Sequence, residues 1–139
     1  MVACLRSSTL FRTAPIVDLI NISRHLKLIH VTRGSSIIRE GEAGNDVYII
    51  FNGRMRIYRS GVAFADLEIG ESIGELCILQ QLSSIQYSSF TASALVNCSL
   101  LVLSRKVLET LICDNCSIAR GVLESVTIAL RRASYKVSF

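Results

Sequence analysis

The chain has 139 residues, of which 50% are hydrophobic and 19% are charged, and its formal net charge is +4 at pH 7. A chain of this length and apolar content can bury a core as a single domain, which excludes disorder as a description of the whole sequence. The modest positive charge is spread over short clusters, so it does not by itself indicate a nucleic-acid partner.

No stretch of the sequence predicts a membrane span or a secretory signal. The first eight residues lack a continuous apolar segment. The one long uncharged run, residues 76–104, contains several glutamines and serines and is too polar for a bilayer. We therefore expect a soluble chain in the cytoplasm, or the cytoplasmic domain of a larger and possibly membrane-bound protein.

The five cysteines are an odd number with irregular spacing, which favours a reducing compartment over a disulfide framework. Cys113 and Cys116 form a C-x-x-C pair, a pattern found in zinc sites and redox motifs. A zinc site would need a second pair of ligands, and neither His25 nor His30 is suitably placed in the sequence. We therefore expect no metal and no cofactor.

In chain order, the sequence first predicts one helix and then a series of strands. Pro15 and the apolar residues after it predict a helix over about 15–25. Short strand-like runs separated by turn residues follow over about 26–103. Asn52-Gly53 lies between two such runs and is the strongest local signal for a β-hairpin. The arginines in residues 54–59 are typical of the solvated face of a strand, although a basic patch for an acidic partner is the alternative.

Helical periodicity resumes at Ser104, a suitable N-cap, and continues in two helices over about 105–135. Asp114 and Asn115 interrupt the pattern between them. Strands bracketed by helices predict an α+β fold: an antiparallel β-roll, or jelly-roll-like barrel, with an N-terminal helix and two C-terminal helices in a single domain over 1–139. The last helix is amphipathic, so its second face could cover the barrel, dimerise or contact a partner domain.

Two glycines four residues apart, Gly70 and Gly74, predict two tight turns in quick succession. Glu75 follows and opens a short apolar run, which fits the first turn of a helix. Unpaired N–H groups at such a helix start favour a phosphate. The same pattern fits a structural turn with a solvated glutamate, because short glycine motifs are weak signals.

Together these features resemble the cyclic-nucleotide-binding domain family, which includes catabolite-activator-type regulators, protein kinase A regulatory subunits and cyclic-nucleotide-gated channels. Three stretches carry the resemblance: residues 34–53 (GSSIIREGEAGNDVYIIFNG), 67–76 (LEIGESIGEL) and 95–105 (LVNCSLLVLSR). They are similar to the β-roll signature of the family, to the start of its phosphate-binding cassette, and to its last strand with the beginning of the C-terminal helices. The resemblance covers about residues 10–132, nearly the whole chain.

This resemblance implies a site for cAMP or cGMP that begins at Ile73 and Gly74. The glycine matching Gly74 lets the backbone approach the ligand, and the glutamate matching Glu75 binds the ribose 2′-hydroxyl. Backbone N–H groups near Leu76 and Cys77 correspond to those that bind the cyclic phosphate.

The sequence departs from the family where the cassette ends, because the family has an arginine there that neutralises the phosphate. Counting backwards from Leu95 and Cys98 places Tyr87-Ser88 at that position, whereas counting forwards from Glu75 places Ser83-Ser84 there. The two counts differ by four residues, so the loop is also longer than usual. Residues 76–104 contain no charged side chain. A charge-assisted hydrogen bond to a buried anion is worth about 1.5–3 kcal/mol, or roughly 10- to 100-fold in affinity.

Other groups could replace this arginine in part. The helix-start N–H groups could hold a phosphate with Ser88 or Ser89 as neutral donors. An arginine from another strand, such as Arg54 or Arg56, could in principle supply the charge.

Two functions follow from the resemblance. The first is a non-catalytic regulatory module with weak or lost cAMP or cGMP binding, which acts through protein or interdomain contacts made by the C-terminal helix. The alternative is a functional sensor that binds cAMP or cGMP through Gly74, Glu75 and the helix-start amides. We expect no catalysis, because no nucleophile–base pair or paired carboxylates occur. We expect no nucleic acid, because no helix-turn-helix follows the last helix.

A further motif lies near the end of the chain, where residues 130–135 read LRRASY. This sequence resembles the substrates of basophilic kinases such as protein kinase A and makes Ser134 a candidate phosphorylation site. Alternatively, its two arginines simply complement the dipole of the last helix.

Overall fold

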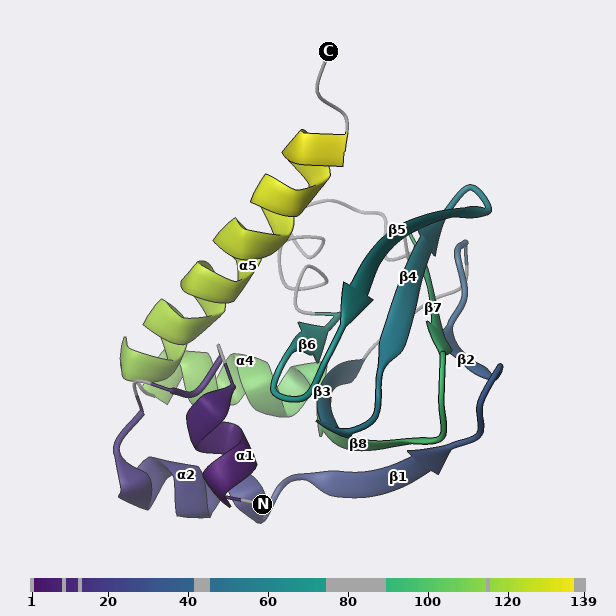
Figure 1. Ribbon diagram of the computed structural model, residues 1–139. Helices are drawn as coiled ribbons and strands as arrows, with labels where there is room; N and C mark the ends of the chain where they lie inside the picture. The colour runs from purple at the N-terminus through teal and green to yellow at the C-terminus, as the bar shows by residue number, and fades with distance from the viewer. Residues whose placement is uncertain are drawn as a thin grey trace.

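The structure is a computed structural model, and it describes residues 2–8, 10–12, 14–41, 46–74, 90–114 and 116–136. The elements in chain order are α1 (Val2–Ser7), α2 (Ile16–Ser23), β1 (Lys27–Val31), β2 (Ser36–Ile38), β3 (Asp46–Asn52), β4 (Met55–Arg59), β5 (Val62–Leu67), β6 (Ser72–Ile73), β7 (Thr91–Ala94), β8 (Cys98–Ser104), α4 (Arg105–Asp114) and α5 (Cys116–Lys136) (Figure 1).

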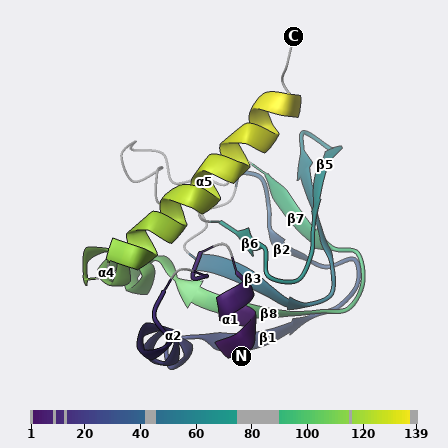
Figure 2. The ribbon, with the colours of Figure 1, turned by 60° about the vertical axis from the view of Figure 1, so that its left-hand side comes forward.

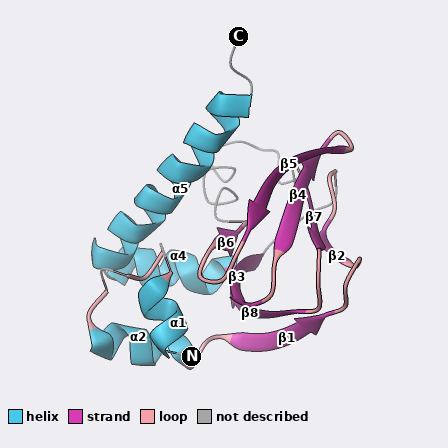
Figure 3. Ribbon diagram, in the orientation of Figure 1, coloured by secondary structure: helices cyan, strands magenta, loops and turns pink. Residues whose placement is uncertain are grey.

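The strands form two antiparallel sheets, in the orders β1-β8-β3-β6 and β2-β7-β4-β5. The helices gather on one side of the roll, with α1, α2 and α4 near one end and α5 running diagonally along it (Figures 1 and 3). This arrangement confirms the predicted α+β fold with an antiparallel β-roll and two C-terminal helices. Within the described parts of the chain, none of the helices combines the length and the apolar character that a membrane span requires.

Strands β3 and β8 lie at the centre of the fold, because they are buried on both faces. Alternate residues of each strand point to opposite faces of the sheet. One face belongs to the helix-side cluster, formed by Leu5, Leu10, Phe11, Ala14, Leu19, Ile22, Val47, Ile49, Leu101, Leu103, Leu108, Ile118, Val122 and Val126. The other belongs to the roll-interior cluster, formed by Val31, Ile50, Met55, Ile57, Leu67, Ile73, Ala92, Ala94, Cys98 and Leu100. Burial on both sides explains why the sequences of these two strands are nearly continuous runs of apolar residues.

The predicted hairpin at Asn52-Gly53 is wrong. β3 pairs with β6 and β8, whereas β4 pairs with β5 and β7, so the chain passes from one sheet to the other at this point. Only glycine fits at position 53, because the φ there is +103° and an added Cβ would lie 2.6 Å from Cys98 Sγ. The tight hairpin lies at Ser60-Gly61 instead, where both residues have positive φ (53° and 79°) and Arg59 pairs with Val62.

The helix boundaries follow the sequence closely, with one addition. The predicted helix over 15–25 is α2, Ile16–Ser23. The N-cap at Ser104 is confirmed, since the Val107 N–H donates to Ser104 Oγ at 3.2 Å. The helix α1 was not predicted, and it places Leu5, which is fully buried, in the helix-side cluster.

The long helix α5 is held against the N-terminal segment and against the strand β6. Gly121 packs so closely that an added Cβ would lie 2.8 Å from the carbonyl carbon of Leu10 and closer still to its oxygen. Ser125, which is 5% exposed, has its hydroxyl 3.1 Å from that of Ser72 on β6. Figure 2 shows α5 running from α4 past β6 toward the C-terminus. The position of α5 is therefore linked directly to the segment that leads into Gly74.

Candidate functional site

The turn that precedes the candidate cassette is held on β3 by backbone hydrogen bonds. The Gly70 N–H donates to Ile50 O at 2.9 Å, and the Ile50 N–H donates to Glu71 O at 3.0 Å. The turn is closed by the Glu71 N–H, which donates to Glu68 O at 3.0 Å, and by the Glu68 N–H, which donates to Glu71 Oε2 at 2.7 Å. Gly70 has φ +89°, so the tight turn predicted there is confirmed.

Gly74 lies directly after β6, and the structure permits only glycine at this position. Its φ is +95°, and an added Cβ would lie 2.7 Å from the carbonyl oxygen of Asp46. The preceding residue, Ile73, pairs with Tyr48 of β3 and is only 2% exposed. The side chain of Ile73 belongs to the roll-interior cluster, so its contribution to a ligand site would come from its backbone.

The remaining residues predicted to bind a ligand lie outside the described residues. They are Glu75, Leu76, Cys77, Ser88 and Ser89. The structure therefore brings together Ile73 and Gly74 of the predicted set, and the roles assigned to the others stay predictions. Phe90 is described, and its partly buried side chain packs against the roll-interior cluster.

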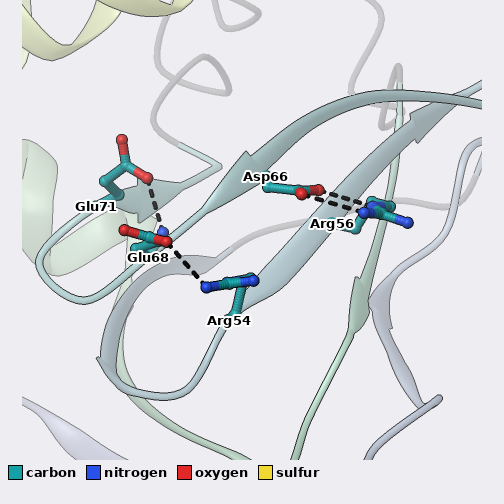
Figure 4. Close-up of polar contacts among 5 residues, drawn as sticks. All are labelled: Arg54, Arg56, Asp66, Glu68 and Glu71. Atoms are coloured by element: carbon teal, nitrogen blue, oxygen red, sulfur yellow. Dashed lines mark hydrogen bonds and ion pairs between the residues drawn. The ribbon is translucent and has the colours of Figure 1, made fainter.

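The two arginines considered as substitutes for the missing cassette arginine are already paired with carboxylates (Figure 4). Arg56 donates to Asp66 through Nε at 2.7 Å and through Nη2 at 3.1 Å. Arg54 Nη2 lies 3.2 Å from Glu68 Oε1. The hydrogen bond from Arg56 lowers the pKa of Asp66, so this carboxylate remains ionised at neutral pH. Both ion pairs are on the exposed surface of the β4–β5 hairpin.

Sequence reasoning missed these carboxylate partners. Counting outward from the turn at Ser60-Gly61 places Arg56 opposite Ala65, but a bulge between Ile57 and Tyr58 shifts the register by one residue and brings Arg56 opposite Asp66. Residues directly opposite on adjacent strands interact through their side chains. Arg59, the last residue of β4, lies over the ring of Phe64 with 4.9 Å between its Cζ atom and the ring centroid.

Arg105, the first residue of α4, is a largely buried cation that sequence reasoning did not single out. Its side chain is 14% exposed and its Nε lies 3.3 Å from Glu109 Oε1. Its buried Nη1 has no hydrogen-bond partner among the described residues. Leu108, one turn later on α4, belongs to the helix-side cluster.

A shallow depression of about 370 Å³ lies at the other end of the β3–β8 sheet from Gly74, and its lining includes His30, Asn97 and Ser99. Its polar groups hold the local loops together: Asn97 Oδ1 accepts a hydrogen bond from the Arg33 N–H at 2.9 Å, and His30 Nδ1 is 3.0 Å from Ser99 Oγ. Among the described residues, no three His, Cys, Asp or Glu side chains are grouped so as to hold a metal ion.

The sequence and the fold are similar to those of several known proteins. The cGMP-dependent protein kinase egl-4 of Caenorhabditis elegans is 27% identical over 94 residues, which are 68% of this chain and 11% of the kinase. The catabolite activator protein of Thermus thermophilus has a TM-score of 0.78 at 24% identity, with 94% of this chain and 62% of that chain covered. The sensor domain of the transcriptional regulator DNR from Pseudomonas aeruginosa has a TM-score of 0.76 at 21% identity, with 100% and 99% covered.

The match to the kinase thus spans about a tenth of that relative, whereas the structural similarity extends over nearly all of this chain. A family model described as the cyclic nucleotide-binding domain matches residues 28–115, which is more than half of the 139 residues. The match includes the turn at Gly70 and the glycine at position 74 described above. This chain therefore belongs to the cyclic nucleotide-binding domain family.

Proposed function

We propose that this chain is a non-catalytic regulatory module whose binding of cAMP or cGMP is weak or lost, and which acts in the cytoplasm through a protein or an interdomain contact. The observation that carries the proposal is the position of the arginines. Residues 76–104 contain no charge, and the arginines of the adjacent hairpin, Arg54 and Arg56, already have carboxylate partners. The largely buried Arg105 is paired with Glu109.

The missing charge has a predictable effect on affinity. One charge-assisted hydrogen bond to a buried phosphate is worth about 1.5–3 kcal/mol, so its absence weakens binding roughly 10- to 100-fold or somewhat more. Moving Arg56 to a ligand would in addition break its two hydrogen bonds to Asp66. The helix-start amides would then hold the phosphate with neutral donors alone.

The contact surface we propose is α5. Leu123 on this helix is 66% exposed, and Thr127, one turn later, is also exposed. The opposite face of α5 packs into the helix-side cluster through Ile118, Val122 and Val126. The exposed face of α5, which includes Leu123, is therefore the face that a partner would contact.

The alternative function, a working cAMP or cGMP sensor, is favoured by the geometry at Gly74. The positive φ and the close approach to Asp46 O are the features that let a glycine bring the backbone near a ligand. The glutamate that follows it, Glu75, is the residue type that the family uses for the ribose.

Isothermal titration calorimetry of the purified chain with cAMP and with cGMP separates the two functions. We expect either no heat or a dissociation constant in the high micromolar range or weaker. A dissociation constant in the low micromolar range or below, for either nucleotide, would overturn the proposal. The complete absence of heat at millimolar ligand would exclude the sensor.

Three variants assign any binding that is detected. Glu75→Ala removes the candidate ribose ligand, so nucleotide bound at the cassette must bind more weakly to this variant. Ser88→Arg and Ser84→Arg restore a cation at the two positions that alignment allows. If only the charge is missing, one of them gains roughly 10- to 100-fold in affinity.

A further inference from the structure

The last turns of α5 carry a basic motif that the regulatory function does not use. Arg131 and Arg132 precede Ser134 by three and two residues, and the bulky Tyr135 follows it. Ser134 is the one serine or threonine of the sequence with arginine at both of these preceding positions.

The helix places this motif away from the packed part of the molecule. α5 extends from Cys116 to Lys136, and among the side chains that the structure describes Val126 is the last one of this helix in the helix-side cluster. Beyond that point Thr127 and Arg131 are exposed. In Figure 1, α4 and α2 lie near the N-terminal end of α5, and the C-terminal end of α5 lies far from both.

We propose that Ser134 is a phosphorylation site for a basophilic protein kinase. In this step the Ser134 Oγ attacks the γ-phosphorus of ATP, a new P–O bond forms, and the bond to the β–γ bridging oxygen breaks. ADP leaves, and the hydroxyl proton passes to the catalytic base of the kinase. A kinase binds its substrate as an extended peptide. Because the motif from Arg131 to Tyr135 lies within the last two turns of α5, only those turns must unwind, and helix ends open most easily.

Phosphorylation here would neutralise most of the positive charge at the helix end. The phosphate adds a charge of about −1.5 to −2 beside Arg131, Arg132 and Lys136. A negative group at a helix C-terminus also opposes the helix dipole, so the last turn becomes less stable. The consequence is a change of charge and order at one end of the surface proposed for partner contact, although the modification itself does not depend on that proposal.

The test is phosphorylation of the complete chain by the catalytic subunit of a cAMP-dependent protein kinase with ATP, followed by peptide mapping in a mass spectrometer. We expect phosphate on Ser134 in the parent chain and at least a 10-fold lower total incorporation in Ser134→Ala. Ser138→Ala is the matched control and should leave incorporation unchanged. Arg131→Gln combined with Arg132→Gln should reduce it as strongly as Ser134→Ala does.

The outcomes separate the proposal from the simpler role of the arginines at the helix end. If the arginines only complement the dipole, the double glutamine variant lowers the stability of α5 but leaves phosphorylation unchanged, which would overturn the proposal. No phosphate on Ser134 in the folded chain would overturn it too, even if a peptide of residues 128–139 were modified. Hydrogen exchange of residues 127–136 should be faster in the phosphorylated chain, and slower exchange would overturn the predicted loosening of the last turn.

Discussion

Replacing Gly121 by alanine tests how closely α5 packs on the N-terminal segment. An added Cβ would overlap the backbone carbonyl of Leu10, with the carbonyl carbon only 2.8 Å away. A backbone group cannot rotate aside as a side chain can, so α5 must move outward. This movement would loosen the contacts that Ile118 and Val122 make in the helix-side cluster.

The expected magnitude is the difference of two opposing effects. Alanine is favoured over glycine in a helix interior by about 1 kcal/mol. Overpacking of a tight contact costs typically 1–3 kcal/mol, and overlap with backbone belongs to the upper end, about 3 kcal/mol. Gly121→Ala should therefore lower the free energy of unfolding by about 2 kcal/mol, which for a chain of this size lowers Tm by roughly 8 °C.

Circular dichroism during thermal and urea unfolding measures this change. Arg120→Ala is the matched control, because Arg120 is the exposed neighbour on the same helix and its replacement should alter stability by less than about 0.5 kcal/mol. If Gly121→Ala proved as stable as the parent chain, or more stable, α5 would not contact Leu10 in the way described, and the reasoning would fail.

Three further predictions follow from contacts in the fold. Ser104→Ala removes the N-cap of α4 and should lower the free energy of unfolding by about 1 kcal/mol in urea titrations. Because Arg56 lowers the pKa of Asp66, this carboxylate stabilises the fold above the ordinary aspartate pKa of about 3.9, and the contribution disappears as the pH falls through the lowered folded-state value. Asp66→Asn should therefore be less stable than the parent chain at pH 7 and equally stable near pH 2. Cys113 is exposed, whereas burial raises the pKa of the Cys4 thiol, so brief alkylation at pH 8 with peptide mapping should label Cys113 before Cys4.

Each of these has a defined control. Ser104→Thr keeps a hydroxyl and should retain most of the stability, so an equal loss in both variants would contradict the capping role. For the ion pair, Asp66→Asn should have no further effect in an Arg56→Gln background, and an undiminished effect would mean that the two side chains are not coupled. Alkylation of Cys4 at the rate of Cys113 would show that its burial is absent in solution.

Much of the fold could be predicted because apolar periodicity reports burial directly. The run at Val47–Phe51 identified a strand, and Ser104 identified the start of a helix. The pattern at Asn52-Gly53 reports only a preference for positive φ, and a crossing between two sheets requires that conformation as a hairpin does. The helix α1 is six residues long, too short for a helical period to be recognised.

For the candidate site, the sequence predicted the conformation of Gly70 and Gly74 because glycine is needed wherever φ is positive. It could not predict that Arg54 and Arg56 are engaged by carboxylates. Those pairs depend on the register of the β4–β5 hairpin, which a bulge between Ile57 and Tyr58 shifts by one residue. The role of Glu75 stays a prediction.

The contact between Gly121 and Leu10 is also a point about which α5 can tilt. From Gly121 to Lys136 the helix is about 22 Å long, so a tilt of about 10° at this contact displaces the far end by about 4 Å. The hydroxyl pair of Ser125 and Ser72 lies close to this contact, only about one helical turn from Gly121. A small shift of β6, too small to disturb the core, would therefore be magnified several-fold at the end of α5 that carries Ser134.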